Sequence, residues 1–317
     1  MSGIFFSIPL LPVKMEQRKW KGAGKMKIGI IGAGAIGLLY GGWLGKLHEV
    51  TLFPRTKAQA GQLNEKGITV KDSASSFRTI VKADGTFSSL SSQDLVIVAV
   101  KQYDLPAVAA VLKHEDGGVP ALFLQNGMGH LALLEKLPQK TILVGTVEHG
   151  ASRLDGTTVK HNGHGKTNIA VYHGKWDESV QLHTDAFPFT MQPDYELMLL
   201  RKCFANAVIN PLTAVLKVKN GELVSNPHYA RVFRAVFEEL VALFPKLSRE
   251  KMWEEATGIC KNTCENESSM LKDVKKGART EIDAILGYML ETAARQNSRV
   301  PLASALYEMV KGMEEKG

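Results

Sequence analysis

The spacing of hydrophobic and polar positions changes near residue 193. Before it, short apolar runs rich in β-branched residues alternate with polar or glycine-rich segments, which is typical of buried strands joined by helices. From Asp194 onward, apolar residues recur at helical spacing and strand-like runs are almost absent. The pattern predicts an α/β domain over 26–193 and an all-α domain over 194–317.

Several strands are predicted in the first domain. The runs 27–31 and 94–100 are almost continuously apolar, as expected of parallel strands covered on both faces. We expect 157–162 and 167–172 to form an antiparallel hairpin, because Gly163-His164-Gly165 between them has the composition of a turn. The remaining predicted strands cover 49–53, 121–124, 141–149 and 187–192.

A G-x-G-x-x-G motif, residues 32–37, directly follows the first predicted strand. In such a motif Gly32 permits a tight turn, Gly34 lets the backbone approach a pyrophosphate, and Gly37 lets the next helix pack on the strand. The start of that helix offers unpaired N–H groups to phosphates. The strand–turn–helix context favours a Rossmann-type doubly wound sheet that binds a dinucleotide over an ordinary glycine-rich turn.

The second predicted strand indicates which dinucleotide is bound. An NAD-specific protein places a carboxylate at its end, to bind the ribose 2′-hydroxyl. This chain has Arg55 and Lys57 there instead. A guanidinium can grip a 2′-phosphate in bidentate fashion, so the sequence favours NADP(H). The alternative is a surface arginine in a polar loop.

Two polar residues follow other predicted strands, Lys101 after 94–100 and Asn126 after 121–124. Ligands of open α/β sheets bind outside the carboxyl ends of the strands. Lys101 and Asn126 are therefore candidates for contacts to cofactor or substrate, although either could be a solvated loop residue.

The second domain begins with a predicted helix over 196–210, which Asp194 can cap and Pro211 should kink or end. Lys202, Asn206 and Asn210 recur every four residues on this otherwise apolar helix, so they share one stripe. Buried polar groups need partners. The stripe therefore either faces the cofactor across a cleft, with partners supplied by a substrate, or reaches solvent or a domain contact.

Composition excludes several protein classes. The 317 residues are 44% hydrophobic and 22% charged, too apolar for a disordered chain, and no apolar run is long enough to cross a bilayer. Of the net charge of +7, +4 lies in residues 1–25. The rest of the chain has an ordinary charge and few aromatic residues, which argues against a nucleic-acid partner.

We interpret 1–25 as an N-terminal extension outside the fold, with Met26 as the natural start; a membrane or partner anchor is the alternative.

Cysteine and histidine positions predict no metal site. Cys203, Cys260 and Cys264 show no disulfide spacing, which suits a reducing cytoplasm. Cys260 and Cys264 would share a helix face, and we interpret them as small buried residues. His161 and His164 have ligand-like spacing but lie at a predicted turn, so we interpret them as structural or solvent-exposed.

From Met26 to its end, the chain resembles ketopantoate reductase (2-dehydropantoate 2-reductase), the NADPH-dependent enzyme family of pantothenate synthesis. Residues 1–25 have no counterpart in the family pattern. The order and spacing of six segments carry the resemblance. They are GAGAIG (32–37), NGMG (126–129), RKCFANAVINPLT (201–213), NGEL (220–223), SSML (268–271) and TEID (280–283).

The resemblance implies roles for individual residues. Lys202 resembles the family's catalytic general acid, and Glu281 its carboxylate at the reaction centre. Substrate binding is implied for Asn126, Asn206, Asn210, Asn220 and Ser269. Cofactor binding is implied for Gly32, Ala33, Gly34, Ala35, Ile36, Gly37, Arg55, Lys101, Asn126, Ala151 and Glu281. Family members often have Trp where this chain has Leu200, which we expect to alter the substrate fit.

The implied activity is NADPH-dependent reduction of 2-dehydropantoate (ketopantoate) to pantoate in pantothenate and coenzyme A biosynthesis, in the cleft between the two domains. We expect a cytoplasmic monomer or homodimer that binds NADP(H) and a small 2-keto acid, with no nucleic-acid or membrane partner. Two alternatives are a related NADP-dependent reductase of another 2-keto or 3-hydroxy acid, and a non-catalytic NADP-sensing protein. The presence of Lys202 and Glu281 argues against the sensor, because a binding protein has no need of a proton donor.

Overall fold

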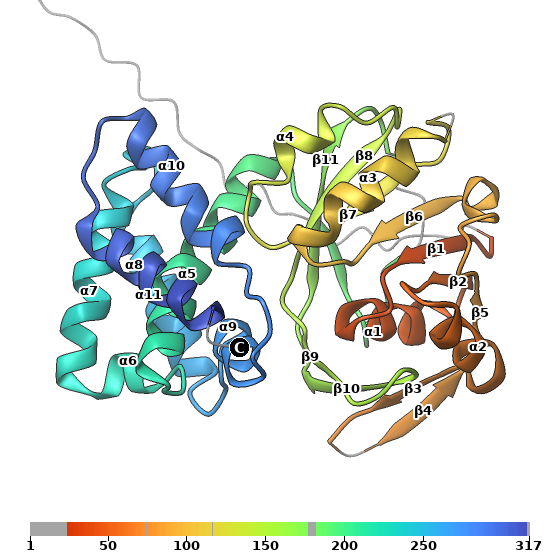
Figure 1. Cartoon of the computed structure of the whole chain (residues 1–317), viewed down its shortest axis with the longest axis horizontal. Coiled ribbons are helices and arrows are strands. Elements are labelled where there is room, and N and C mark those ends of the chain that lie inside the picture. Colours follow the sequence, from red (N-terminus) through yellow and green to blue (C-terminus); the bar gives the residue numbers. More distant parts are fainter. Residues whose placement is uncertain (1–23, 74, 116, 177–181, 316–317) are drawn as a thin grey trace, which may run out of the picture.

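The computed structural model describes residues 24–73, 75–115, 117–176 and 182–315. Its two halves, one built on sheets and one helical, lie side by side in Figure 1, which confirms the predicted fold class. The interpretation of 1–25 as an extension falls outside the described residues, apart from Gly24 and Lys25. In the part of the chain that the structure describes, none of the helices combines the length and apolarity needed to span a bilayer.

The larger sheet has eight strands in the order β12-β11-β8-β7-β6-β1-β2-β5. Six of them are parallel: β1 (Lys27–Ile31), β2 (Glu49–Phe53), β5 (Lys82–Ala83), β6 (Leu95–Val98), β7 (Ala121–Phe123) and β8 (Ile142–Val147). β11 (Thr167–His173) is antiparallel to β8, and β12 (Phe189–Met191) pairs parallel to β11. The strand order reverses at β1, which lies between β2 and β6; this is the Rossmann-type switch point where such sheets bind dinucleotides.

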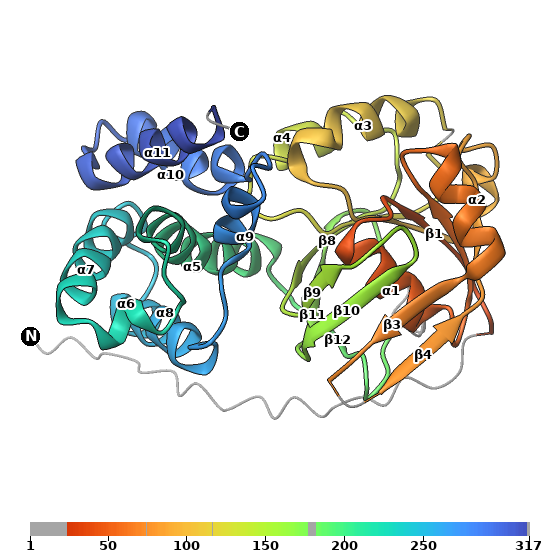
Figure 2. The same cartoon turned by 60° about the horizontal axis from the view of Figure 1, so that its bottom comes forward.

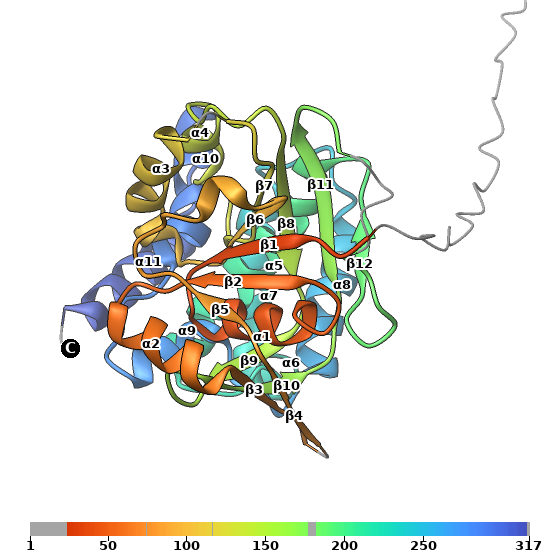
Figure 3. The same ribbon diagram turned by 90° about the vertical axis from the view of Figure 1, so that its right-hand side faces the viewer.

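Helices and a smaller sheet cover the larger one. The helical segments of this half are α1 (Ala35–Leu44), α2 (Lys57–Lys66), η1 (Leu90–Ser92), η2 (Gln102–Asp104), α3 (Leu105–Lys113) and α4 (Leu131–Leu134). A four-stranded sheet, β4 (Ser76–Thr79), β3 (Ile68–Lys71), β10 (Thr158–Gly163) and β9 (Gly150–Arg153), packs on the outer side of α1 (Figure 2). Glycines make this close approach possible: a Cβ at Gly42 would lie 2.3 Å from the Val70 side chain. Figure 3 shows α1 between the two sheets.

The predicted hairpin of 157–162 with 167–172 is wrong. β10 pairs with β9 and β3 in the small sheet, whereas β11 pairs with β8 and β12 in the large one. The turn at Gly163-His164-Gly165 therefore carries the chain from one sheet to the other. Strand periodicity specifies which face of a strand is buried, but it does not identify a non-local partner such as β3.

The helical half is arranged around α5 (Tyr195–Leu216), which Asp194 caps by accepting a hydrogen bond from the N–H of Leu197 (3.0 Å). The other segments are α6 (Glu222–Ser225), α7 (Pro227–Val241), α8 (Arg249–Asn262), α9 (Ser269–Lys275), the π-helical η3 (Asp283–Gly287), α10 (Tyr288–Arg295) and α11 (Pro301–Glu314). The alternative that Pro211 ends the first helix is wrong, because α5 continues to Leu216. Pro211 removes one N–H from the helix ladder and crowds the Ala207 carbonyl, and packing of the buried residues around it outweighs these costs.

The two halves share one core. Buried residues of the sheet, such as Val144, belong to the same hydrophobic cluster as Phe204 and other buried residues of α5, and α5 contacts β8 and β11. Cys260 is buried, as predicted, and so is Cys203. Cys264 is exposed, so its interpretation as a buried residue is wrong: α8 ends at Asn262, and Cys264 lies beyond the helix.

Candidate active site

The glycine motif leads from β1 into α1. Gly32 has a φ of +99°, and its N–H donates to the Phe53 carbonyl (3.0 Å). A Cβ at Gly37 would lie 1.7 Å from the Gly32 carbonyl oxygen, so only glycine fits there. A Cβ at Gly34 would instead meet nothing within 4 Å, and no side chain caps the N-terminus of α1 at this point. Open space in front of unpaired helix N–H groups fits a phosphate.

The other proposed cofactor positions surround this turn. Ala33 is buried, and its carbonyl accepts a hydrogen bond from the Gln59 side chain (3.0 Å). Ala35 and Ile36 are half-buried in the first turn of α1. Ala151 is half-buried in β9, a strand that contacts α1.

Arg55 lies in the link between β2 and α2, next to Thr56, which caps α2. Its side chain is exposed and forms no ion pair or hydrogen bond with any described residue. β2 is the neighbour of β1 in the sheet, so Arg55 and the glycine motif both follow carboxyl ends of adjacent strands. The guanidinium of Arg55 at this edge of the sheet is available to a second phosphate group of a dinucleotide, in addition to the pyrophosphate at the glycine motif.

Glu281 is the centre of a charged cluster that joins the two halves. Its Oε2 lies 3.1 Å from Lys101 Nζ and accepts a hydrogen bond from Asn126 Nδ2 (3.0 Å). The backbone N–H of Gln102 donates to its Oε1 (3.4 Å). Lys101 also pairs with Asp273 at 3.1 Å. The structure therefore brings together three of the residues singled out in the sequence, Lys101, Asn126 and Glu281.

Burial and charge act in opposite directions in this cluster. Burial alone would lower the pKa of Lys101, but the negative charges of Glu281 and Asp273 hold it above its usual value. Burial raises the pKa of Asp273, and Lys101 offsets part of that increase. Lys101 is thus held as a cation at neutral pH, beside the carboxyl ends of β6 and β7.

The π-helical turn η3 connects this cluster to the helix that carries Lys202. A Cβ at Gly127, the residue after Asn126, would lie 2.0 Å from the Ala284 carbonyl oxygen of η3. On the other side, the thiol of Cys203, the residue after Lys202, contacts the Ile285 carbonyl at 3.7 Å. The loop that bears Asn126 and the α5 segment that bears Lys202 therefore both pack against η3.

The polar stripe of α5 has unused hydrogen-bonding capacity. Lys202 is half-buried and forms no ion pair or hydrogen bond with a described residue. Burial lowers its pKa, and the charge of Glu148 opposes part of that shift. The side chains of Asn206, half-buried, and Asn210, buried, likewise form no hydrogen bond within the described ranges. A cation and two amides on one stripe can receive the oxygen atoms of a small anionic substrate.

Asn220 and Ser269 lie in other segments of the helical half. Asn220 is buried, its Nδ2 donates to Thr263 Oγ1 (2.8 Å), and its Oδ1 is buried without a partner among the described residues. Ser269 is exposed at the start of α9, and the neighbouring Ser268 caps that helix. Thr213 of α5 donates to Ser268 (2.7 Å), which fixes the start of α9 against α5. No hydrogen bond links Asn220 or Ser269 to Lys202 in the described part of the chain.

Sequence reasoning missed two supporting residues. Asp273, the second partner of Lys101, lies in short helix α9, where an acidic residue is usually solvent-exposed. Gln125 is buried, and its Nε2 donates to the carbonyls of Val98 and Val100 (both 3.0 Å), which joins the loops after β6 and β7. A glutamine directly before Asn126, in an apolar context, was the available signal.

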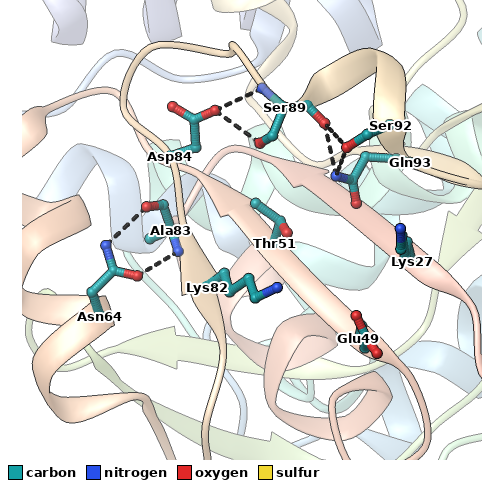
Figure 4. Close-up of a pocket in the computed structure, with 10 residues that line it drawn as sticks. All are labelled: Lys27, Glu49, Thr51, Asn64, Lys82, Ala83, Asp84, Ser89, Ser92 and Gln93. Carbon is teal, nitrogen blue, oxygen red and sulfur yellow. Dashed lines mark hydrogen bonds between the residues drawn. The ribbon is translucent and has the colours of Figure 1, made fainter.

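A separate pocket lies at the opposite edge of the sheet (Figure 4). It is lined by residues at the starts of strands, among them Lys27 and Glu49, whereas the glycine motif follows the end of β1. Several of its polar groups are already paired with each other: Asn64 forms two hydrogen bonds with the backbone of Ala83. It is therefore unrelated to the site at the carboxyl ends of the strands.

Comparisons with known proteins agree with this geometry. Residues 28–174 match the family described as "Ketopantoate reductase PanE/ApbA", and 194–314 match its C-terminal counterpart. The 2-dehydropantoate 2-reductase of Listeria monocytogenes is 40% identical over 298 residues, covering 92% of this chain and 98% of the relative. A crystal structure of a probable 2-dehydropantoate 2-reductase from Bacillus subtilis is 38% identical, with a TM-score of 0.81 over 91% of this chain and 100% of that one. D-mandelate dehydrogenase, solved with NADH and anilino(oxo)acetate, shares the fold at 21% identity, with a TM-score of 0.81 over 92% of this chain and 99% of that one.

Proposed function

Because this chain belongs to the ketopantoate reductase family, a family of NAD(P)-dependent oxidoreductases, we propose that it reduces 2-dehydropantoate to pantoate with NADPH. The product would serve pantothenate and coenzyme A biosynthesis. The observation that carries the proposal is Lys202, a half-buried lysine without an ion-pair partner among the described residues, on the same stripe of α5 as Asn206 and Asn210. That arrangement suits proton donation to a bound carbonyl.

The residues of the sheet half fit NADP(H). The open space at Gly34 and the uncapped start of α1 would admit the pyrophosphate, with Gly32, Ala33, Ala35, Ile36 and Gly37 forming the turn around it. Arg55 would bind the 2′-phosphate, and an acidic side chain that would repel this group is absent from 53–57. Lys101, Asn126 and Ala151, together with Glu281 of the helical half, would contact the rest of the cofactor. When bound, NADPH supplies the hydride that reduces the keto carbon.

Lys202 is the proposed general acid. Its ammonium group would donate a hydrogen bond to the keto oxygen, offset the negative charge that develops there, and transfer a proton as the alkoxide forms. The lowered pKa of Lys202 makes this proton easier to transfer than that of an exposed lysine.

The remaining site residues would hold the substrate. Asn206 and Asn210, next to Lys202 on the stripe, would bind the carboxylate and hydroxyl oxygens, together with Asn126, Asn220 and Ser269. Glu281 is already oriented by Lys101 and Asn126, so its carboxylate would accept a hydrogen bond from the substrate hydroxyl. We propose a domain boundary at residue 194, between an NADP-binding domain over 26–193 and a helical substrate-binding domain over 194–317, with Asn126 and Glu281 reaching the ligand of the other domain. We also propose a cytoplasmic location, which suits the three free cysteines.

The test is NADPH oxidation by the purified protein with ketopantoate, beside pyruvate, 2-oxoisovalerate and phenylglyoxylate. Oxidation that is much faster with ketopantoate supports the proposal. A clear preference for another 2-keto acid would indicate a related reductase with a different cleft, for which Leu200 is the first residue to examine. Tight NADPH binding with no oxidation in the presence of any substrate would instead indicate the sensor.

A further inference from the structure

Three histidines and an aspartate gather at the small sheet, outside the proposed active site. His161 lies in β10, His164 in the link from β10 to β11, His149 between β8 and β9, and Asp72 just after β3. One ligand atom from each of Asp72, His161 and His164 lies within 4.8 Å of the other two. The rings of His161 and His164 have centroids 4.0 Å apart. The three histidines lie within 149–164, whereas Asp72 lies 92 positions before His164, so the fold itself brings Asp72 to them.

Hydrogen bonds define which nitrogen of His161 carries its proton. The backbone N–H of Gly165 donates to Nδ1 of His149 (3.2 Å), so this nitrogen is an acceptor. The contact of 3.2 Å between His149 Nδ1 and His161 Nε2 must then have His161 as the donor. A neutral His161 protonated on Nε2 has its lone pair on Nδ1.

That lone pair has no hydrogen-bond partner in the part of the chain that the structure describes. His161 is 2% exposed, and its Nδ1 is buried without a hydrogen bond to any described residue. A buried imidazole that donates from one ring nitrogen to a neighbour, with a lone pair on the other, is the usual state of a metal-binding histidine.

The two remaining groups are held next to each other at the surface. His164 Nε2 lies 2.6 Å from Asp72 Oδ2, and the Asp72 carboxylate is also fixed by the backbone N–H of Ser73 (2.6 Å). His164 is exposed and Asp72 half-buried, so both side chains can shift. Ligands of a tetrahedral Zn²⁺ ion lie about 3.3 Å apart, given Zn–N and Zn–O distances near 2.0 Å. Small side-chain movements would therefore bring the three ligand atoms to that spacing.

We propose that Asp72, His161 and His164 bind a divalent transition-metal ion of the Zn²⁺ class, with the remaining coordination position open to water. The ion would join the end of β3 to the link between the two sheets. His161 lies directly opposite Ala151 in the β9–β10 pair, so the ion would also stiffen the strand that bears a proposed cofactor contact. It takes no part in the proposed hydride transfer, and the site is independent of it.

The test uses the full chain after treatment with EDTA and measures Zn²⁺ binding by isothermal titration calorimetry. Co²⁺ absorption in the visible range gives a second readout, because tetrahedral Co²⁺ with nitrogen ligands has strong bands there. We expect one Zn²⁺ per chain, at least about 100-fold weaker binding in His164→Ala, and unchanged binding in His173→Ala. His164 and His173 are both exposed, so neither variant removes a core side chain.

Asp72→Asn is the second variant, and it should weaken Zn²⁺ binding while the unfolding temperature of the EDTA-treated protein stays close to that of the wild type. Saturable binding that is equally tight in the wild type, His164→Ala and Asp72→Asn would overturn the proposal. So would the absence of one-to-one binding in the wild type.

Discussion

Lys101 Nζ lies 3.1 Å from Glu281 Oε2, although the two residues are 180 positions apart in the sequence. Lys101 follows β6 of the Rossmann-type half, and Glu281 precedes η3 of the helical half. The pair thus connects the segment that would meet the cofactor with the segment that packs against the Lys202 helix. The Glu281 side chain is 5% exposed, so solvent screens the charge of its carboxylate little.

This pair should contribute to stability. We expect Glu281→Gln to lower the free energy of unfolding by about 1–3 kcal/mol, because among the described residues it leaves the half-buried Lys101 with Asp273 as its one ion-pair partner. Urea denaturation of Glu281→Gln, Lys101→Met and the double variant measures the coupling. Strictly additive effects would show that the contact has no energetic role.

Two glycines of the motif should respond differently to alanine. Gly34→Ala places its Cβ in open space, so we expect a stability change below about 0.5 kcal/mol but a marked loss of NADPH affinity, since the methyl group would occupy the phosphate position. Gly37→Ala forces its Cβ against the Gly32 carbonyl and should lower both stability and affinity.

Thermal unfolding and NADPH fluorescence titration separate these effects. Gly61→Ala is the matched control, because Gly61 lies in α2 with nothing near its Cβ position. It should raise stability by up to about 1 kcal/mol and leave NADPH affinity unchanged. Normal NADPH affinity in Gly34→Ala would contradict the proposal that the pyrophosphate binds at this turn.

Arg55 should determine the preference for NADPH over NADH. We expect Arg55→Ala to raise the KM for NADPH by roughly 10- to 100-fold, which corresponds to the loss of a charge-assisted hydrogen bond, and to leave the KM for NADH unchanged. Arg299→Ala, an exposed arginine in the loop between α10 and α11, is the control. Equal changes for NADPH and NADH would contradict a 2′-phosphate contact.

Lys202 should set the alkaline limit of activity. It must be protonated to donate, and burial lowers its pKa, so kcat/KM should fall on the alkaline side at a lower pH than the usual lysine pKa of about 10.4 predicts. Glu148 opposes that lowering, so Glu148→Gln should move the fall to lower pH still. Glu135→Gln, another exposed carboxylate, is the control for the pH–rate profiles. An alkaline midpoint at or above 10.4 would contradict the assignment.

Local patterns explain what the sequence could predict. The turn at Gly32 and the capped start of α5 at Asp194 each depend on neighbouring residues, and each lies where its local pattern indicated. Non-local contacts explain the errors. β10 pairs with β3, about 90 residues earlier, and no feature of its own sequence distinguishes this partner from β11.

The same distinction applies to the candidate site. The stripe of Lys202, Asn206 and Asn210 follows from helical spacing alone, but Asp273 becomes recognisable only when α9 is placed beside the end of β6. The lone pair of His161 depends on hydrogen bonds among His149, Gly165 and His161 that only the folded chain creates. The substrate and cofactor roles of the individual residues remain predictions.

The most direct test of the account is the turnover of Lys202→Ala with NADPH and ketopantoate. Loss of the general acid should lower kcat by about 10²- to 10⁴-fold, while the Kd for NADPH, measured by fluorescence titration, stays close to that of the wild type. Near-normal turnover in this variant would contradict Lys202 as the proton donor and, with it, the proposed mechanism.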